Sequence, residues 1–115
     1  MGSFVDRLAS ELELERKAVL HLVDTFFSAS WEDVRLLEDA LARGDAWALG
    51  RHAHDIKGAA AGLQFEGSRR AAEELEMAGR DGRMAEAAPF LASLRAELEK
   101  LQKERDREAA TESDA

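Results

Sequence analysis

The residues best suited to do chemistry lie in one short stretch, His52–Leu63. At about 100° of helical rotation per residue, His54, Lys57 and Gly58 share one face of a helix, while the apolar residues of the stretch gather on another. We therefore expect the imidazole of His54 to point away from the core. An exposed imidazole is a nucleophile, and a lysine one turn along can neutralise an approaching anion. This combination indicates a histidine that accepts a phosphoryl group.

Gly58 supports this interpretation because glycine is a poor helix former. Inside a helix it costs about 0.5–1 kcal/mol relative to alanine, so its presence indicates a gain elsewhere. A bare backbone one turn after His54 leaves one side of the imidazole open to a bulky partner. The alternative is that Gly58 is chance variation and Lys57 an ordinary solvated lysine.

The segment Ala53–Ala60 reads Ala-His-Asp-Ile-Lys-Gly-Ala-Ala. It resembles the Ala-His-x-Leu/Ile-Lys-Gly-Ser/Ala-Ala signature of histidine-containing phosphotransfer (HPt) domains, both stand-alone ones and those of chemotaxis-type histidine kinases. The resemblance covers roughly residues 19–100 and includes Phe26-Phe27, Gly44-Asp45, Leu75-Glu76 and Gly79-Arg80. It departs at Gln64, where glycine is usual, so the end of the histidine helix can differ by a residue or two.

The resemblance implies a phosphocarrier in a two-component phosphorelay. His54 would accept a phosphoryl group from a histidine kinase, a hybrid kinase or a receiver-domain aspartate, and pass it to a receiver-domain aspartate. In the chemotaxis-kinase branch, the glutamate at the offset of Glu76 accepts a hydrogen bond from the imidazole. A carboxylate on Nδ1–H fixes the tautomer and makes Nε2 the better nucleophile. The alternative for Glu76 is a solvated residue in the acidic run that includes Glu73 and Glu74.

We expect a carrier and not an enzyme, with no cofactor or metal of its own. The glycines near His54 form no nucleotide-cradling loop. Phosphoryl transfer is mainly positioning and charge neutralisation, so Mg²⁺ is expected on the partner receiver domain. A metal site of His52, His54 and Asp55 is disfavoured, because residues two apart on a helix lie about 200° apart.

The surface on which a partner docks is expected to include Gly58, Arg51, Gly50 and Ala61. His52 lies nearly opposite His54 on the helix, so a structural role is expected for it. Trp31 and Trp47 are expected to anchor the core or a bundle end. The alternative function is a helical adaptor that docks receiver domains without being phosphorylated, and the retention of the His-x-x-Lys-Gly pattern argues against it.

The composition limits the other classes of partner. The 115 residues suffice for one domain, and 16 basic against 24 acidic residues give a net charge of −8. With no basic cluster, nucleic acid is not expected as a partner. The chain has no cysteine and no apolar run of about eighteen residues, so we expect a cytoplasmic protein with no membrane segment. The apolar stripes fit one bundle, which predicts a monomer.

Apolar residues recur at intervals of three and four along most of the chain, which predicts an all-α fold. A capping box at Ser3–Asp6 opens a short first helix. A long helix over about residues 16–41 follows, either continuous or mildly kinked at Ser28–Ser30. Gly44 and Asp45 are the residue types that end one helix and begin the next.

The histidine helix is expected over residues 46–63 and the next helix over 68–78, stopped by Gly79–Gly82. Pro89 falls in the first turn of the last helix, where proline is tolerated. Because short connections make successive helices antiparallel, we predict an up-and-down antiparallel four-helix bundle with a short extra N-terminal helix.

Two further predictions concern packing and extent. The second and third bundle helices are expected to approach closely, because small residues recur on both: Ala53, Ala60, Ala71 and Ala72. The bundle domain is expected over residues 1–105, followed by a polar, disordered tail over 106–115.

Overall fold

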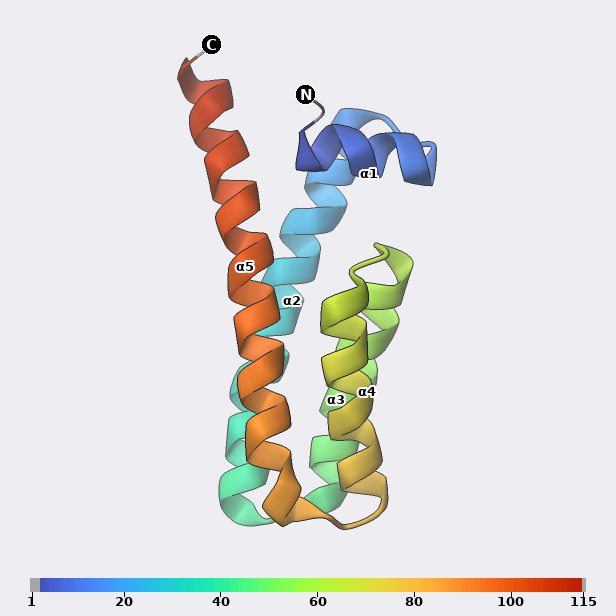
Figure 1. Ribbon diagram of the computed structural model, residues 1–115, viewed down its shortest axis with the longest axis vertical. Helices are drawn as coiled ribbons and strands as arrows, with labels where there is room; N and C mark the ends of the chain where they lie inside the picture. The colour runs from blue at the N-terminus through green and yellow to red at the C-terminus, as the bar shows by residue number, and fades with distance from the viewer. Residues whose placement is uncertain (1–2, 115) are drawn as a thin grey trace.

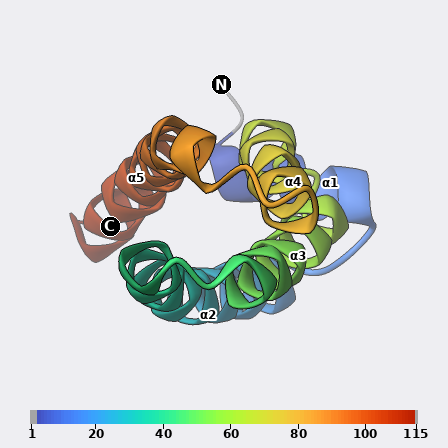
Figure 2. The same ribbon diagram turned by 90° about the horizontal axis from the view of Figure 1, so that it is seen from below.

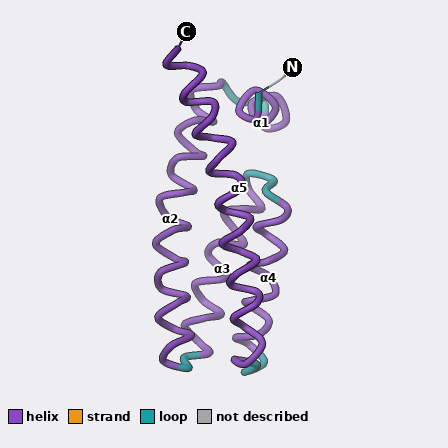
Figure 3. The backbone as a smooth tube through the Cα atoms, turned by 60° about the vertical axis from the view of Figure 1, so that its left-hand side comes forward, coloured by secondary structure: helices purple, strands orange, loops and turns teal. Residues whose placement is uncertain are grey.

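The structure is a computed structural model that describes residues 3–114, with the side chains of residues 3–108. The elements are α1 (Phe4–Leu12), α2 (Arg16–Arg43), α3 (Ala46–Gly62), α4 (Glu66–Arg80), the short 3₁₀ helix η1 (Met84–Glu86) and α5 (Ala87–Asp114). Within this part of the chain, helices are joined by short loops and there is no strand (Figure 3). None of its helices is long and apolar enough to span a membrane.

Helices α2 to α5 form the predicted up-and-down four-helix bundle. Seen along the bundle axis, they follow one another around the core, and α5 closes the ring beside α2 (Figure 2). The short helix α1 lies across one end of the bundle, as predicted for an extra N-terminal helix (Figure 1). Because the connections are short, each helix runs antiparallel to the one before it, which accounts for this topology.

The bundle is held together by an apolar core to which all four long helices contribute. Its largest fully buried apolar side chains are Leu37, Leu49, Ile56, Leu75, Leu94, Leu98, Val19 and Val23. Burial of each such side chain contributes about 1.5–3 kcal/mol. The four alanines expected between the second and third bundle helices are buried as well. The core therefore fixes which face of α3 remains outside.

Local sequence signals set the helix ends that flank the histidine helix. Gly44 ends α2 in the left-handed conformation, with φ of 65°. The Asp45 side chain accepts a hydrogen bond from the Ala48 N–H at 3.0 Å and so caps α3. α2 runs unbroken through Ser28–Ser30, in agreement with a continuous or mildly kinked helix. At the chain start, Ser3 Oγ accepts from the Asp6 N–H at 3.0 Å, as predicted.

Helix α4 is longer than predicted at both ends. The predicted stop at Gly79–Gly82 is confirmed, because the helix ends at Arg80 and Gly82 takes the left-handed conformation with φ of 69°. Gly79 itself is still helical. Gly79 serves the packing of α3 on α4, because a Cβ there would lie 2.7 Å from the backbone oxygen of Ala46 and 2.7 Å from the backbone nitrogen of Gly50. This close approach forms the floor of the site described below.

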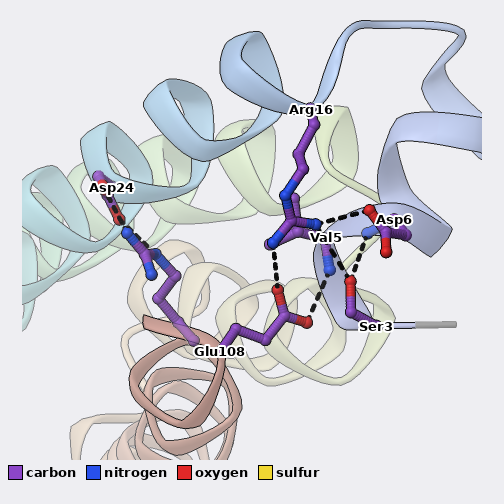
Figure 4. A network of polar contacts seen from close by, with 7 residues as sticks. Ser3, Val5, Asp6, Arg16, Asp24 and Glu108 are labelled. Carbon is purple, nitrogen blue, oxygen red and sulfur yellow. Dashed lines mark hydrogen bonds and ion pairs between the residues drawn. The ribbon is translucent and has the colours of Figure 1, made fainter. Parts of the chain in front are cut away.

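The polar C-terminal segment also differs from the prediction, since α5 remains helical to Asp114. Two contacts explain its order as far as residue 108. Arg105 makes a bidentate ion pair with Asp24 of α2, at 2.9 and 3.2 Å. Glu108 accepts a hydrogen bond from the Val5 N–H of α1 at 2.9 Å (Figure 4). The segment thus gains partners far away in the sequence, which its composition does not reveal.

Candidate functional site

His54 lies in the middle of α3, on the face opposite the core. The neighbouring positions Leu49, Ala53 and Ile56 are buried, so the helix is oriented by them. The side chain of His54 is 64% exposed. The expected outward direction of the imidazole is therefore confirmed.

Glu76 of α4 reaches this imidazole from the neighbouring helix. Its Oε2 lies 2.5 Å from Nδ1 of His54, and only 10% of its side chain is exposed. The interpretation of Glu76 as a solvated member of an acidic run is therefore wrong. A carboxylate can only accept, so this hydrogen bond places the imidazole proton on Nδ1. In the neutral imidazole the lone pair is then on Nε2.

Lys57 completes the cluster through the other oxygen of the same carboxylate. Its Nζ donates to Glu76 Oε1 at 2.6 Å, and Arg80 Nη2 lies 3.8 Å from that oxygen. Burial raises the pKa of the Glu76 carboxyl, but hydrogen bonds from Lys57 and His54 outweigh it, so the net pKa lies below the ordinary 4.5. Glu76 is therefore ionised at neutral pH, as an acceptor for both partners must be.

Lys57 is not the ordinary solvated lysine of the alternative interpretation. The side chain is 27% exposed and its ammonium is held on Glu76. An ammonium has three donors, so two remain for other acceptors. The structure thus brings together His54, Lys57 and Glu76, which lie on two helices.

A hollow of about 670 Å³ adjoins His54, between the N-terminal half of α3 and the C-terminal end of α4. Of the four residues expected on the docking surface, Gly50 and Arg51 line it. Gly58 and Ala61 are exposed on the other side of His54 and do not line it. This hollow therefore lies on the side of the imidazole that faces the start of α3.

Trp47 was expected to anchor the core or a bundle end, and the core alternative is wrong. Its side chain is 73% exposed and lines the hollow, and the guanidinium of Arg51 lies 5.6 Å from the centre of its ring. The adjacent positions Ala48 and Leu49 face the core instead. The available signal was its spacing of two helical turns before His54, which puts both on one face.

Four other residues of the hollow were missed as members of the site: Ala46, Asp55, Gly79 and Arg80. Arg80 lies one turn after Glu76, and that spacing was the available signal. Ala46 enters only through the close contact of α3 with α4, which no local pattern predicts. Trp31 behaves as expected: it packs against the core, and its Nε1 donates to Gln102 Oε1 at 3.2 Å.

His52 faces α2, away from His54, and its Nδ1 lies 3.6 Å from Asp33 Oδ1. With Asp55, these residues bring three ligand atoms within 4.8 Å of one another, the one such group in the described part of the chain. His54 is excluded from it, as the helical geometry requires. Burial and then the Asp55 carboxylate raise the pKa of Asp33. A histidine with two carboxylates is a set that divalent cations accept, so the absence of a bound metal stays a prediction.

Comparisons with known proteins agree with the geometry of the site. Residues 21–104 match the Hpt domain family. The crystal structure of histidine-containing phosphotransfer protein B (HptB) from Pseudomonas aeruginosa PAO1 is similar to this one, with 32% sequence identity and a TM-score of 0.78 over 87% of this chain and 90% of that chain. Among proteins of curated function, none matches the chain. The family match spans most of the sequence and includes the His54 cluster, and the chain belongs to the Hpt domain family.

Proposed function

We propose that His54 is the residue through which this Hpt protein, a phosphocarrier of phosphorelay signalling, takes up and releases its phosphoryl group. The observation that carries the proposal is the 2.5 Å contact between the Glu76 carboxylate and Nδ1 of an exposed imidazole. In the neutral ring this contact puts the lone pair on Nε2, on an exposed side chain that a partner can reach. His52, the other histidine of α3, is turned toward Asp33 of α2.

The transfer can be written with each electron pair assigned. The Nε2 lone pair attacks the phosphorus of the acyl phosphate on a receiver aspartate. The P–O bond to that aspartate breaks, and its electron pair returns to the carboxylate. The phosphorylated ring carries a positive charge that is delocalised to Nδ1–H, where the ionised Glu76 carboxylate stabilises it. Transfer to the next receiver reverses these steps.

Lys57 is proposed to neutralise the arriving phosphoryl group. Its Nζ is within hydrogen-bonding distance of Glu76, which holds it near the imidazole, and its remaining donors can turn to the phosphoryl oxygens. We propose no cofactor or metal in this chain for the transfer, with Mg²⁺ supplied by the receiver domain. The rest of the transition-state charge would then be met by the partner.

The proposed protein is a carrier without enzyme activity of its own. It would act as a monomer in the cytoplasm, between a histidine kinase or hybrid kinase and a receiver domain. One chain buries the apolar faces of all four bundle helices, which supports the monomer. The alternative, an adaptor that binds receivers without being phosphorylated, makes no use of the contact between His54 and Glu76.

The test compares wild type with His54→Gln and with His52→Gln as the matched control. Each is incubated with a labelled phosphorylated receiver domain, and the protein-bound phosphate is tested for acid lability and alkali stability. We expect an acid-labile, alkali-stable phosphate on wild type and His52→Gln, and none on His54→Gln. If no protein is labelled while all three bind the receiver equally well, the adaptor is the better description.

A further inference from the structure

Trp47 is an unusual residue to find on the surface beside His54. Its ring is 73% exposed, and the Arg51 guanidinium over it holds it in place. A cation over an aromatic face contributes about 0.5–1 kcal/mol at an exposed site. Tryptophan and arginine are the residue types that most often dominate the free energy of protein–protein binding. The pair is therefore a preformed anchor at the surface.

Trp47 lies close enough to His54 to fall within the area that a docked receiver covers. Seven helical residues separate them by about 10.5 Å along the axis and only about 20° around it. Phosphoryl transfer requires the partner's reacting atom within about 3–3.5 Å of Nε2. A standard interface covers about 800 Å² on each partner, which as a disc centred on His54 has a radius of about 16 Å. Such an interface includes Trp47.

A partner that contacts Trp47 also contacts the hollow next to it. Its floor is where α3 and α4 meet at Gly50 and Gly79, so closely that a methyl group at Gly79 would strike the α3 backbone. The two glycines let the backbones of α3 and α4 lie in close contact, and the recess lies over this crossing. The recess adjoins the Trp47 ring and is open to a side chain from a partner.

The charges around the hollow favour a receiver domain over a second copy of this chain. Arg51 and Arg80 line it together with Asp55 and Glu76, and Lys57 is paired with Glu76, so three cations face two carboxylates although the whole chain carries a net charge of −8. A receiver presents a phosphorylated aspartate and the carboxylates that hold its Mg²⁺, which complement these cations. A second copy docked by the same surface would bring the same two arginines against them.

We propose that the receiver domain buries Trp47 and inserts an aliphatic side chain from beside its phosphorylated aspartate into this hollow. The covered area includes Gly58 and Ala61 on the other side of His54, but the anchor lies toward the start of α3. Trp47 and Arg51 set the affinity for the receiver, whereas His54 carries the phosphoryl group. The inference rests on the proposed function and adds the anchor that selects the partner.

The experiment separates docking from chemistry by using two phosphodonors. Phosphoramidate is small enough to reach Nε2 without docking, and its P–N bond breaks with release of ammonia. A phosphorylated receiver must dock. For Trp47→Ala we expect an unchanged rate with phosphoramidate, a KM for the receiver raised about tenfold or more, and an unchanged kcat at saturation. The matched control is Leu22→Ala, which removes another exposed apolar side chain, 41% exposed, from α2.

Charge and burial supply two further readouts. Arg51→Glu is expected to weaken receiver binding and to reduce its dependence on salt. Tryptophan emission of the wild type should shift to the blue on receiver binding, and this shift should be absent from Trp47→Phe. Circular dichroism of each variant checks that the bundle is intact.

The outcomes distinguish this inference from the proposed function. If Trp47→Ala takes phosphate from the receiver with the wild-type KM, the docking inference is overturned while His54 remains the carrier. If neither donor labels wild type, the proposed function fails. Receiver binding then decides the docking inference alone: a weaker Kd for Trp47→Ala supports it, and an equal Kd overturns it.

Discussion

Oε2 of Glu76 lies 2.5 Å from Nδ1 of His54, and the two residues belong to different helices. The protonation pattern of the proposed phosphoacceptor therefore depends on how α4 packs against α3. The glycine contact between Gly79 and Gly50 sets that packing at the same level of the bundle. The chemistry of one side chain is thus tied to the register of two helices.

The first prediction concerns the tautomer of His54. In Glu76→Gln a single amide oxygen replaces two carboxylate oxygens and cannot serve both His54 and Lys57, so the imidazole loses its fixed orientation. We expect phosphorylation by phosphoramidate to slow by about tenfold to a hundredfold, the range typical for loss of an orienting partner. Imidazole ¹⁵N NMR measures the tautomer directly and should move from one dominant form toward a mixture.

Glu74→Gln is the control for this prediction. Glu74 is the exposed acid two residues before Glu76, so the same change of charge is made without touching the imidazole. An equal loss of rate in both variants would show that net charge, and not orientation, controls the reaction.

The second prediction follows from the lowered pKa of Glu76. Since the folded-state pKa lies below the ordinary 4.5, ionised Glu76 stabilises the fold above about pH 4.5, and this contribution is lost as pH falls through the folded pKa. Glu76→Gln should therefore be less stable than wild type at neutral pH, and the gap should close in acid. Urea unfolding between pH 2.5 and 7 measures it. A gap that stays constant with pH would contradict the assigned ion pairs.

Local patterns were sufficient to predict the helices and the shared face of His54 and Lys57. Gly44 and Asp45 act within one turn of the chain, and the apolar periodicity of α2 and α3 needs no knowledge of neighbours. The placement of Glu76 came from a family resemblance, because its contact with His54 joins residues on separate helices. The 2.5 Å contact shows that Glu76 and His54 lie together.

Features that depend on packing between distant elements were not predictable in the same way. The helical wheel placed Trp47 on the His54 face, but whether another element covers that face is decided by the paths of α4 and α5. In the sequence, Gly79 belongs to the segment predicted to end the helix, yet its role is the contact with Ala46 and Gly50. The contact between Glu108 and Val5 spans 103 residues and leaves no local trace.

The third prediction contrasts two glycines. A Cβ at Gly58 meets nothing within 4 Å, so Gly58→Ala should raise the free energy of unfolding by about 0.5–1 kcal/mol. A Cβ at Gly79 would lie 2.7 Å from backbone atoms of α3, which cannot move aside, so Gly79→Ala should lower it by about 1–3 kcal/mol. Urea denaturation measures both. Equal stability of the two variants would mean that α3 and α4 are not in this close contact.

The fourth prediction concerns Asp33, whose pKa is raised by burial and by the nearby Asp55 carboxylate. A raised folded-state pKa means that ionised Asp33 is penalised by folding. Its contribution is favourable below the ordinary value of 3.8 and is lost as pH rises through the folded pKa. Asp33→Asn should therefore raise the Tm at pH 7 and leave it unchanged near pH 3. A lower Tm at pH 7 would mean that the His52 contact outweighs the penalty.

The fifth prediction tests why the polar end of α5 is helical. Glu108 accepts from the Val5 N–H, one of the first-turn donors of α1 that have no partner within the helix. Glu108→Ala should cost about 1 kcal/mol, as loss of a cap does, and lower the Tm by about 4 °C. Amide exchange at Val5 should accelerate in this variant. In Glu108→Gln, which keeps an oxygen, and in Lys103→Ala, on the exposed side of α5, exchange should match wild type. Unchanged Val5 exchange in Glu108→Ala would show that α1 does not depend on α5, because the amide would then have a protecting partner other than this carboxylate.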